Sequence, residues 1–370
     1  MRLKIQQSDL NGPLQAVSRS VGIRTTLPVL ANILLQAQGN KLILSATNLE
    51  IGVIKTINAS VEEEGELTVP AKTFQEIISS LGGMELTLES GGEQLRISAK
   101  KFNVTLNGIS SAEFPAIPLA ADKAASVQAS VLKDSIPQIA FAAAADDGRP
   151  VLTGILTEIT KHTLELVATD GFRLAHKKMN LESVTDQPFK SLIPRRTLEE
   201  VVRLIGEDIE KSDSGLVEIG TSENQIIFKV GDTQVSSRLI EGNFPSWEKI
   251  VPTDFQNITH IDRVDLLKAV KLASVFAKTE ANVIKLEVLD GKIKISSQAR
   301  EVGEQETEIE AQTGQNPIQI AFNAKYLTDA LSSVSSEKVR IEFSGNLSAA
   351  LIKPEGIEGL EYVIMPIRLS

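Results

Sequence analysis

The side chains that most often carry enzymatic chemistry are sparse and scattered in this sequence. The 370 residues include three histidines, His162, His176 and His260, and no cysteine. No histidine has a second one at metal-ligand spacing, and the lack of cysteine excludes disulfides and thiolate metal sites. We expect each histidine to be an ordinary strand or surface residue, and we predict no metal site and no cofactor.

Two further patterns resemble catalytic or phosphate-binding motifs but have simpler explanations. Asp146 and Asp147 could form an acid pair, yet "ADDGRP" is typical of an exposed turn, where Asp and Gly are favoured. The glycines of "GGMELTLESGGEQL" flank strands, and no helix follows the second pair, as a phosphate loop would require. No nucleophile elbow indicates a Ser-His-Asp set. The sequence therefore predicts a protein that is not an enzyme.

Basic residues at matched positions stand out more clearly. Lys72, the pair Arg195-Arg196 and Lys325 each stand at the start of an expected helix, on the face away from its apolar stripe. Cations there oppose the helix macrodipole, so their threefold recurrence favours a functional role. Two interpretations stay open: a solvated helix face balanced by acidic neighbours, or one basic surface that repeated domains build within an acidic protein. Further basic residues on or beside other expected helices are Arg19, Arg24, Lys133, Lys268 and Lys271.

The helices that carry these cations belong to a threefold repeat. The segments "VPAKTFQEIISSLGG", "IPRRTLEEVVRLIGE" and "FNAKYLTDALSSVSS" begin at Val69, Ile193 and Phe322. In each, apolar residues at i, i+3, i+4 and i+7 predict one buried stripe on an amphipathic helix. The repeat period is about 125 residues, far above the 20–50 residues of solenoid repeats. Each repeat is therefore expected to be a whole domain.

An earlier helix and many alternating strands complete each expected domain. The earlier helices are predicted around Leu10, Leu132 and Leu266, and segments such as "IKLEVLDGKIKISS" alternate around turns, as hairpins require. Each domain should then pack two helices on one face of antiparallel sheets, which makes the fold class α+β. We expect three domains at residues 1–122, 123–252 and 253–370.

Composition and charge narrow the function classes. Hydrophobic residues make up 42% and aromatic residues 4%, so we expect globular domains with aliphatic cores. The start "MRLKIQQSDLNG" has no signal-peptide core, and no stretch approaches the roughly 20 apolar residues of a membrane helix. We predict a cytoplasmic protein that does not bind membranes. The net charge of −10 argues against nucleic-acid binding, but a local basic surface can coexist with it.

The repeat, together with several motifs, resembles the bacterial DNA sliding clamps, the beta subunits of DNA polymerase III. The likeness runs from Met1 to Leu369, and the order and spacing of the motifs make it specific. The motifs are "RTTLPVLANILL" at 24–35, "RPVLTG" at 149–154, "ATDGFRLA" at 168–175, "EGNFPSW" at 241–247 and "YVIMPIRL" at 362–369. The resemblance implies the DNA clamp fold and a processivity factor: a homodimer closed head to tail, whose six domains encircle duplex DNA.

The resemblance also implies roles for particular residues in binding DNA and in closing the ring. Helices would line the hole and hold DNA electrostatically, with no base readout. The implied DNA-contacting residues are Arg24, Lys72, Arg149, Arg195, Arg196, Lys268, Lys271 and Lys325. The implied dimer interface sets Lys100, Lys101, Phe102 and Val104 of one protomer against Val275, Phe276, Glu301 and Glu304 of its partner.

A groove between the second and third domains is implied as well, and it would bind short peptides of the polymerase, the clamp loader and other replication or repair proteins. Its wall would consist of Leu152, Thr169, Gly171, Phe172, Arg173, Leu174, Pro245, Lys249, Ile250, Leu347, Ala349, Val363, Met365, Pro366, Ile367, Arg368 and Leu369. An apolar pocket suits Leu or Phe anchors, and a Met adapts to different partners. The sequence departs from the family pattern at three positions of the pocket rim. Phe172 stands where the family often has His, and Lys249 stands where an Arg can occur. Ser370 extends past the usual final Leu.

Three function classes compete at this point: a processivity ring, a non-ring adaptor that binds peptides through repeated domains, and an enzyme of unknown type. The mass in solution separates the first two. The C-terminal "EYVIMPIRLS" bears on the groove. We expect "EYVIM" to be a strand of the third domain and "PIRLS" to leave the sheet along the groove.

Overall fold

Antiparallel strand pairing organises the computed structural model of this chain. Of the predicted site and acid-pair residues, Arg24, Asp147, Glu301 and Leu369 lie outside the described residues, as does Ser370. The structure describes residues 1–22, 27–118, 122–146, 148–181, 188–208, 215–222, 224–278, 281–300 and 303–368.

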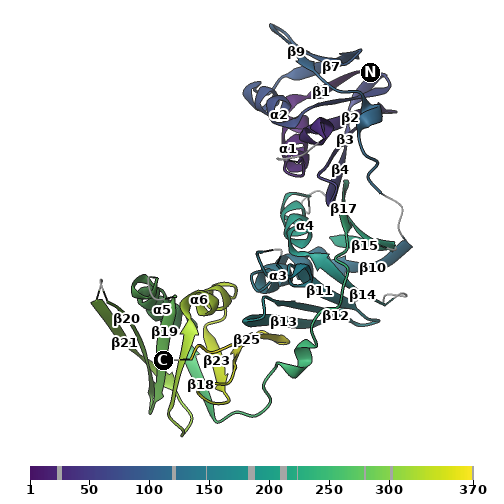
Figure 1. Ribbon diagram of the computed structural model, residues 1–370. Coiled ribbons are helices and arrows are strands. Elements are labelled where there is room, and N and C mark those ends of the chain that lie inside the picture. Colours follow the sequence, from purple (N-terminus) through teal and green to yellow (C-terminus); the bar gives the residue numbers. More distant parts are fainter. Residues whose placement is uncertain are drawn as a thin grey trace. The chain divides into compact units, whose positions relative to one another are not determined.

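The chain forms two compact units, each assembled from two stretches of sequence. The first unit contains Met1–Ser130 and Arg196–Leu239, and the second contains Val131–Arg195 and Ile240–Ser370. Residues of the expected central domain therefore take part in both units. Figure 1 labels the helices and many of the strands of each unit.

The first unit contains a five-stranded and an eight-stranded sheet. Within the larger sheet β17 pairs with β4, with Val235 opposite Val53, so strands of the expected first and second domains share one sheet. The smaller sheet has the order β5 (Ser60–Glu63), β1 (Arg2–Gln6), β7 (Glu85–Gly91), β8 (Gln94–Ala99) and β9 (Phe102–Asn107). The larger has the order β10 (Asp122–Gln128), β15 (Leu216–Ser222), β16 (Gln225–Val230), β17 (Thr233–Arg238), β4 (Ile51–Asn58), β3 (Lys41–Thr47), β2 (Asn32–Gln38) and β6 (Gly65–Pro70).

The second unit is built on a twelve-stranded sheet. In it β13 pairs with β25, from Arg173 opposite Ile364 to Lys177 opposite Leu360, which joins strands of the expected second and third domains. The strand order is β14 (Phe189–Pro194), β11 (Gly154–Ile159), β12 (Thr163–Thr169), β13 (Arg173–Asn180), β25 (Leu360–Ile364), β24 (Ala350–Pro354), β23 (Lys338–Phe343), β18 (Asn257–Asp262), β21 (Gly303–Gln312), β20 (Lys292–Ala299), β19 (Val283–Leu289) and β22 (Ile318–Asn323).

Six α-helices are present in the described part of the chain, and none of them is long and apolar enough to cross a membrane. They are α1 (Gln7–Ser18), α2 (Ala71–Ser80), α3 (Ala129–Ala140), α4 (Arg195–Asp208), α5 (Arg263–Ala277) and α6 (Ala324–Ser332). Phe74 of α2, Leu198 of α4 and Leu327 of α6 are buried, as the apolar stripes predicted. Helices α1 and α2 pack together and α1 covers β3 and β4, while α5 packs on α6 and covers β19, β20 and β21 (Figure 1). The predicted α+β arrangement is confirmed.

Polar caps fix where the two helices of the third repeat begin. The Asp262 carboxylate accepts hydrogen bonds from the N–H groups of Val264 and Asp265 at 2.8 and 2.9 Å. The Asn323 side chain accepts one from the N–H of Lys325 at 2.9 Å. Such N-caps satisfy backbone donors that the helix itself leaves unpaired. The cap at Asn323 therefore places Lys325 in the first turn of α6.

The C-terminal segment forms the strand that the sequence predicted and then leaves the sheet. Strand β25 contains "LEYVI", so the prediction that "EYVIM" is sheet is confirmed up to Ile364. Beyond the strand, the N–H of Met365 donates to the carbonyl of Phe172 at 2.9 Å, and the N–H of Ile367 donates to the carbonyl of Ala321 at 2.8 Å. These bonds hold the outgoing segment against the turn before β13 and against β22.

Two glycines in the turn between β24 and β25 allow a test of how much the stability of the second unit depends on the contact between this turn and β13. A Cβ on Gly359, whose φ is +68°, would lie 2.1 Å from the Lys178 carbonyl oxygen, whereas one on Gly356, with φ +78°, would meet no atom within 4 Å. We expect Gly359→Ala to lower the free energy of unfolding by about 3 kcal/mol, and the control Gly356→Ala by about 1 kcal/mol, because only backbone strain applies there. Urea unfolding followed by the fluorescence of Trp247, the single tryptophan, measures both. Equal losses would show that the close approach is unimportant.

Candidate functional site

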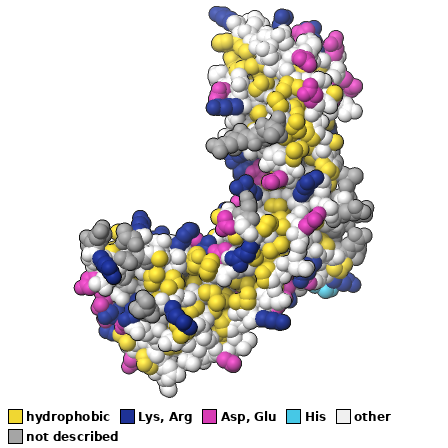
Figure 2. All heavy atoms as spheres, viewed as in Figure 1, with side chains coloured by type: hydrophobic (Ala, Val, Ile, Leu, Met, Phe, Trp, Pro, Cys, Tyr) yellow, Lys and Arg dark blue, Asp and Glu magenta, His cyan; other side chains and the backbone are white. Residues whose placement is uncertain are grey.

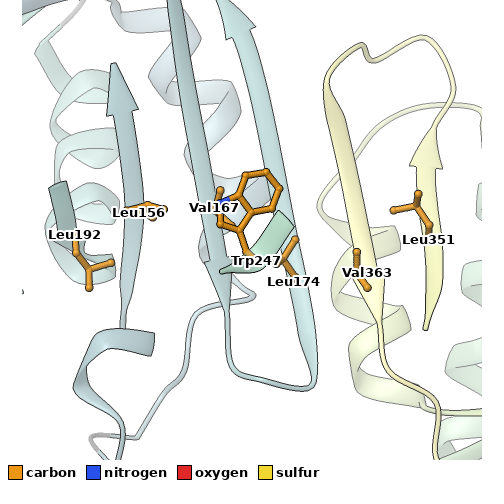
Figure 3. Close-up of a cluster of buried hydrophobic side chains, with 7 residues drawn as sticks. All are labelled: Leu156, Val167, Leu174, Leu192, Trp247, Leu351 and Val363. Atoms are coloured by element: carbon orange, nitrogen blue, oxygen red, sulfur yellow. The ribbon is translucent and has the colours of Figure 1, made fainter. Parts of the chain in front are cut away.

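A cluster of buried apolar side chains lies where β13 meets β25, and we call it the junction cluster (Figure 3). Its members are Leu156, Val167, Leu174, Leu192, Trp247, Leu351 and Val363. Leu174 stands opposite Val363 in the β13–β25 pair, and Leu351 stands opposite Val363 on its other side. Leu174 and Val363, both predicted groove residues, are almost fully buried. They belong to the floor beneath the surface of this region.

Four large apolar side chains remain exposed on the segments that contribute to this cluster or pack on it, and we call them the apolar rim. They are Phe172, Ile250, Leu347 and Met365, with exposed fractions from 40% to 58%. Figure 2 shows apolar side chains gathered on the surface of the second unit around β13, β23 and β25. Single exposed apolar residues are ordinary, but a group of large ones from separate segments marks an interaction surface. All four were predicted groove residues.

The turn that presents Phe172 is held by its own polar side chains. The Thr169 hydroxyl donates to the carbonyl of Arg173 at 2.6 Å and accepts from the N–H of Gly171 at 3.0 Å. The Asp170 carboxylate accepts from the N–H groups of Phe172 and Arg173 at 2.9 and 3.0 Å. Gly171 has φ +93°, which favours glycine. The "ATDGFR" sequence therefore builds a fixed turn with the Phe172 ring exposed at its tip.

Arg173, another predicted groove residue, is buried and supports this turn from behind. Its Nε donates to Asp170 at 3.0 Å, one terminal nitrogen to Asp329 at 2.6 Å, and the other to the carbonyl of Phe141 at 2.7 Å. The guanidinium carbon lies 5.2 Å from the ring centre of Phe141 and 4.7 Å from that of Tyr326. Charge-assisted hydrogen bonds and ring stacking suit the planar guanidinium.

The remaining predicted groove residues surround the same region. Leu152 ends the short 3₁₀ helix η3 (Pro150–Leu152) and is buried. Pro245 precedes the short 3₁₀ helix η5 (Trp247–Lys249) and Lys249 ends it, and both side chains are exposed. Ala349 packs on the junction cluster. After β25, Pro366 and Ile367 are half-buried and Arg368 is exposed.

His176 forms an ionic bridge on the same face of β13 as Leu174. Its Nδ1 lies 2.9 Å from Glu361 and its Nε2 lies 2.8 Å from Glu165. Ionised carboxylates only accept hydrogen bonds, so both contacts are satisfied together when the imidazole carries a proton on each nitrogen. Burial lowers the pKa of His176, but the bonds to Glu361 and Glu165 outweigh it and raise the pKa above 6.5. The ring of Trp247 packs on the imidazole, with 4.4 Å between centres.

The structure therefore modifies the prediction for the histidines. His162 is exposed in a turn and His260 is half-buried on β18, as expected for ordinary residues. His176 is in a strand, also as expected, yet it is the centre of a buried ion bridge. Among the described residues no group of His, Asp and Glu is placed to hold a metal ion.

Several residues of this region were missed by sequence reasoning. Tyr326 stacks on Phe172 with 6.5 Å between ring centres, and Asp329 binds Arg173 from α6. Trp247 stood within the quoted motif "EGNFPSW" without being assigned a role. Trp247 is the only tryptophan in the sequence, and this was the one signal that could have drawn attention to it. Tyr326 and Asp329 gave no such signal, because their partners Phe172 and Arg173 come from a distant segment.

The basic candidates that the structure describes lie mostly on helix surfaces. Lys72 and Arg196 are exposed on α2 and α4, Arg195 is half-buried at the start of α4, and Lys268 and Lys271 are exposed on α5. Because α5 packs on α6, these two lysines and Lys325 stand on neighbouring helices.

Arg149 stands apart from the other basic candidates. It precedes η3, and its guanidinium donates to the carbonyl of Asp170 at 3.1 Å. It also lies close to Gly171, where an added Cβ would come within 3.0 Å of a guanidinium nitrogen. Arg149 therefore lies beside the Phe172 turn, next to the apolar rim.

The candidates for the dimer interface lie at sheet and helix ends. Lys100 and Lys101 are exposed at the turn before β9, and Phe102 and Val104 are on β9, an edge strand of the five-stranded sheet. In the second unit, Val275 and Phe276 are in the last turn of α5 and Glu304 is exposed on β21.

Repeated α+β domains, paired sheets and an exposed apolar rim define a protein of the DNA clamp class. Family models of the DNA polymerase III beta subunit match along the chain: the N-terminal domain at residues 1–118, the central domain at 126–246 and the C-terminal domain at 248–368. The chain belongs to this family, the bacterial beta sliding clamps.

Curated relatives and solved structures agree with this assignment. The beta sliding clamp of Synechococcus elongatus is 32% identical over 376 residues, covering 100% of both chains, and that of Staphylococcus aureus is 32% identical over 373 residues, covering 98% of this chain and 96% of its own. The Pseudomonas aeruginosa sliding clamp superimposes with a TM-score of 0.93 at 30% identity, and the Bacillus subtilis clamp with 0.93 at 28%, each over 100% of both chains.

Family membership confirms the resemblance and decides between the function classes. Beta sliding clamps are DNA polymerase processivity factors: homodimeric rings that bind DNA and hold the polymerase and other partners. The protein is therefore a processivity factor and not an enzyme, and the adaptor alternative is set aside.

The His176 bridge should stabilise the second unit in a pH-dependent way. Because the pKa of His176 is raised in the folded state, its contribution is complete below about 6.5, the unfolded value, and is lost as pH rises through the folded pKa. The hydrogen bond from His176 lowers the pKa of Glu361, so that contribution is present above about 4.5 and lost as pH falls through the folded value. The bridge should contribute most between about pH 5 and 6.5.

We expect His176→Gln to lower the free energy of unfolding by about 1–3 kcal/mol in that window, and by less as pH rises. Urea unfolding at a series of pH values, read by Trp247 fluorescence, gives the difference. His260→Gln is the control, because the His260–Glu355 pair is more exposed. A loss independent of pH would mean that only packing, and not the ion bridge, had been removed.

Proposed function

We propose that this chain closes with a second copy into a ring around duplex DNA and binds partner peptides at the apolar rim. The observation that carries the proposal is the rim itself: four large apolar side chains stay exposed on segments that also supply the junction cluster or a residue packed on it. Two backbone hydrogen bonds tie these segments together, from Met365 to Phe172 and from Ile250 to Trp247. Domains at residues 1–122, 123–252 and 253–370 and action in the cytoplasm are part of the proposal.

The groove would use the rim as its walls and the junction cluster as its floor. A Leu or Phe anchor of a peptide would lie on Leu174, Val363 and Trp247, whose burial gives a rigid apolar base. Phe172, stacked on Tyr326, offers a flat platform, and the unbranched Met365 adapts to anchors of different shape. Arg149, Lys249 and Arg368 would supply positive charge at the edges for acidic peptide groups.

One groove per chain would serve many partners in turn. The polymerase, the clamp loader and other replication or repair proteins would each present a short linear peptide with apolar anchors. Such peptides compete for the same rim, so occupancy follows local concentration and affinity. Griselimycin, which is bound to the Pseudomonas aeruginosa clamp in one solved structure, can be tested for binding to this chain alongside such peptides.

Removing one rim residue should weaken peptide binding selectively. We expect Met365→Ser to weaken the binding of a peptide copied from the clamp-binding segment of its organism's replicative polymerase by about 10-fold or more. Fluorescence anisotropy measures the affinity. Ile258→Ser is the matched control, because Ile258 is as exposed as Met365 but lies on β18 and outside the rim. Equal losses in both variants, or no loss in Met365→Ser, would refute the groove.

Ring closure would pair two sheet edges across the protomers. Strand β9 is an edge of its sheet, and residues 303–310 of β21 pair only with β20 among the described strands. Unpaired edges are prone to add a strand from another chain. Phe102 borders a hollow of about 270 Å³ that would receive Val275 or Phe276 of the second copy. Lys100 and Lys101 would steer the partner's acidic β21 into place.

DNA would be held by charge alone. The helix surfaces that carry Lys72, Arg195 and Arg196, and those that carry Lys268, Lys271 and Lys325, would face the phosphates. Arg24 is part of the proposal by resemblance alone. Such contacts are independent of base sequence and weaken as salt increases. Arg149 was placed with them by resemblance, but its bond to Asp170 favours a place at the rim. The net charge of −10 would keep DNA from the outer surface.

A charge at the proposed interface should open the ring. We expect Phe102→Glu to raise the dimer dissociation constant by about 30-fold or more, because an aromatic anchor that ring closure would bury is lost and a carboxylate would face acidic β21. Sedimentation gives the mass, and retention on nicked circular DNA, lost on linearisation, reports the ring. Leu49→Glu is the control, because Leu49 is equally exposed in the same unit. A dimeric Phe102→Glu variant, or equal wild-type retention on circular and linear DNA, would contradict the proposal.

A further inference from the structure

One carboxylate connects the apolar rim to a lysine on the helix surface proposed to face DNA. The Asp329 Oδ2 on α6 accepts a hydrogen bond from a terminal nitrogen of Arg173 at 2.6 Å and another from the Nζ of Lys325 at 2.6 Å. All three residues belong to the second unit. The same oxygen is therefore shared between the support of the Phe172 turn and the first turn of α6.

The two cations compete for this carboxylate on unequal terms. The Arg173 side chain is 8% exposed and is also held by Asp170 and the carbonyl of Phe141, so its ion pair is costly to break. The Lys325 side chain is 64% exposed, and its pair with Asp329 spans one helical turn at the surface. Exposed pairs of this kind contribute little. A phosphate oxygen can therefore draw Lys325 away at low cost.

Arg173 transmits the state of Asp329 to the rim through two contacts. Its Nε binds the Asp170 carboxylate, which holds the N–H of Phe172. Its guanidinium also lies over the ring of Tyr326, on which the Phe172 ring stacks. A firmer hold of Asp329 on Arg173 would fix both the turn and the stacked pair of rings.

We infer that Asp329 is a positioning residue that couples phosphate contact at Lys325 to peptide binding at the apolar rim. The inference rests on the proposed groove and DNA surface. Without DNA the carboxylate is divided between two cations. When a phosphate takes Lys325, Asp329 binds Arg173 alone, and the Phe172 turn is held in the form that receives a peptide. Linkage is reciprocal, so a bound peptide strengthens the hold on DNA by the same factor.

The expected coupling is about 5-fold, the low end of the range for coupled sites. A clamp on DNA would then bind the polymerase more tightly than a clamp free in solution. Lys268 supplies a matched comparison on α5. It pairs with Asp265 at 3.4 Å, and Asp265 is not one of the groups to which Arg173 donates. Loss of Lys268 should affect DNA binding without touching the rim.

The test measures the affinity of a fluorescent peptide, copied from the clamp-binding segment of its organism's replicative polymerase. Full-length clamp is compared free and loaded on nicked circular DNA. Wild type should bind about 5-fold more tightly on DNA. Lys325→Gln should show the tighter affinity already without DNA and gain nothing from it. Lys325→Arg should restore the coupling, and Lys268→Gln should keep it.

Asp329→Asn should bind the peptide more weakly than wild type in both states and lose the coupling, with solution mass and Trp247 fluorescence unchanged. The inference is overturned if Lys325→Gln binds the peptide with wild-type affinity in the absence of DNA. It is also overturned if DNA tightens peptide binding equally in wild type and in Lys325→Gln. If Met365→Ser leaves the affinity unchanged, the groove is wrong and the coupling falls with it. If wild type is not retained on DNA, the ring is wrong, and the free-clamp comparison still decides the role of Asp329.

Discussion

The backbone pairing of β13 with β25 is the interaction on which the functional region depends. Its register sets Leu174 opposite Val363 and brings the Phe172 carbonyl to the Met365 N–H. Side chains alternate between faces along a strand, so a slip of one residue would exchange the two faces of β13. The junction cluster and the bond of His176 to Glu361 follow from this register, and Arg173 lies on the opposite face of β13 from His176.

Two buried cations on opposite faces of β13 help to specify that register. On one face, Arg173 is bound by Asp170 and Asp329, and on the other, His176 is bound by Glu165 and Glu361. Burying charge is unfavourable unless partners are supplied, so a misaligned strand would leave a charge uncompensated. Hydrophobic burial makes the junction stable, and these ion clusters make it unique. The same clusters position the rim, so specificity of folding and readiness for binding share residues.

Local patterns were enough to predict the helices and most strands. The stripes around Phe74 and Leu327 and the strand that ends at Ile364 depend on periodicity within a few residues, which the sequence displays directly. The partners of His176 and Arg173 could not be found in this way, because Glu361 and Asp329 are 185 and 156 residues distant. The two units could not be foreseen either, since they arise from strands of adjacent domains that pair across the expected boundaries. Resemblance supplied the groove residues but not which are buried supports.

The division of the central strands between two units has a consequence for synthesis on the ribosome. The chain emerges from its N-terminus, and domains usually fold as they appear. Here β4 must wait for β17, and β13, with its unpaired edge, must wait for β25, where Glu361 follows its partner His176 by 185 residues. A nascent chain of this protein therefore carries an open strand edge through nearly half of its translation, and shielding that edge from neighbouring nascent chains is a requirement of its biogenesis.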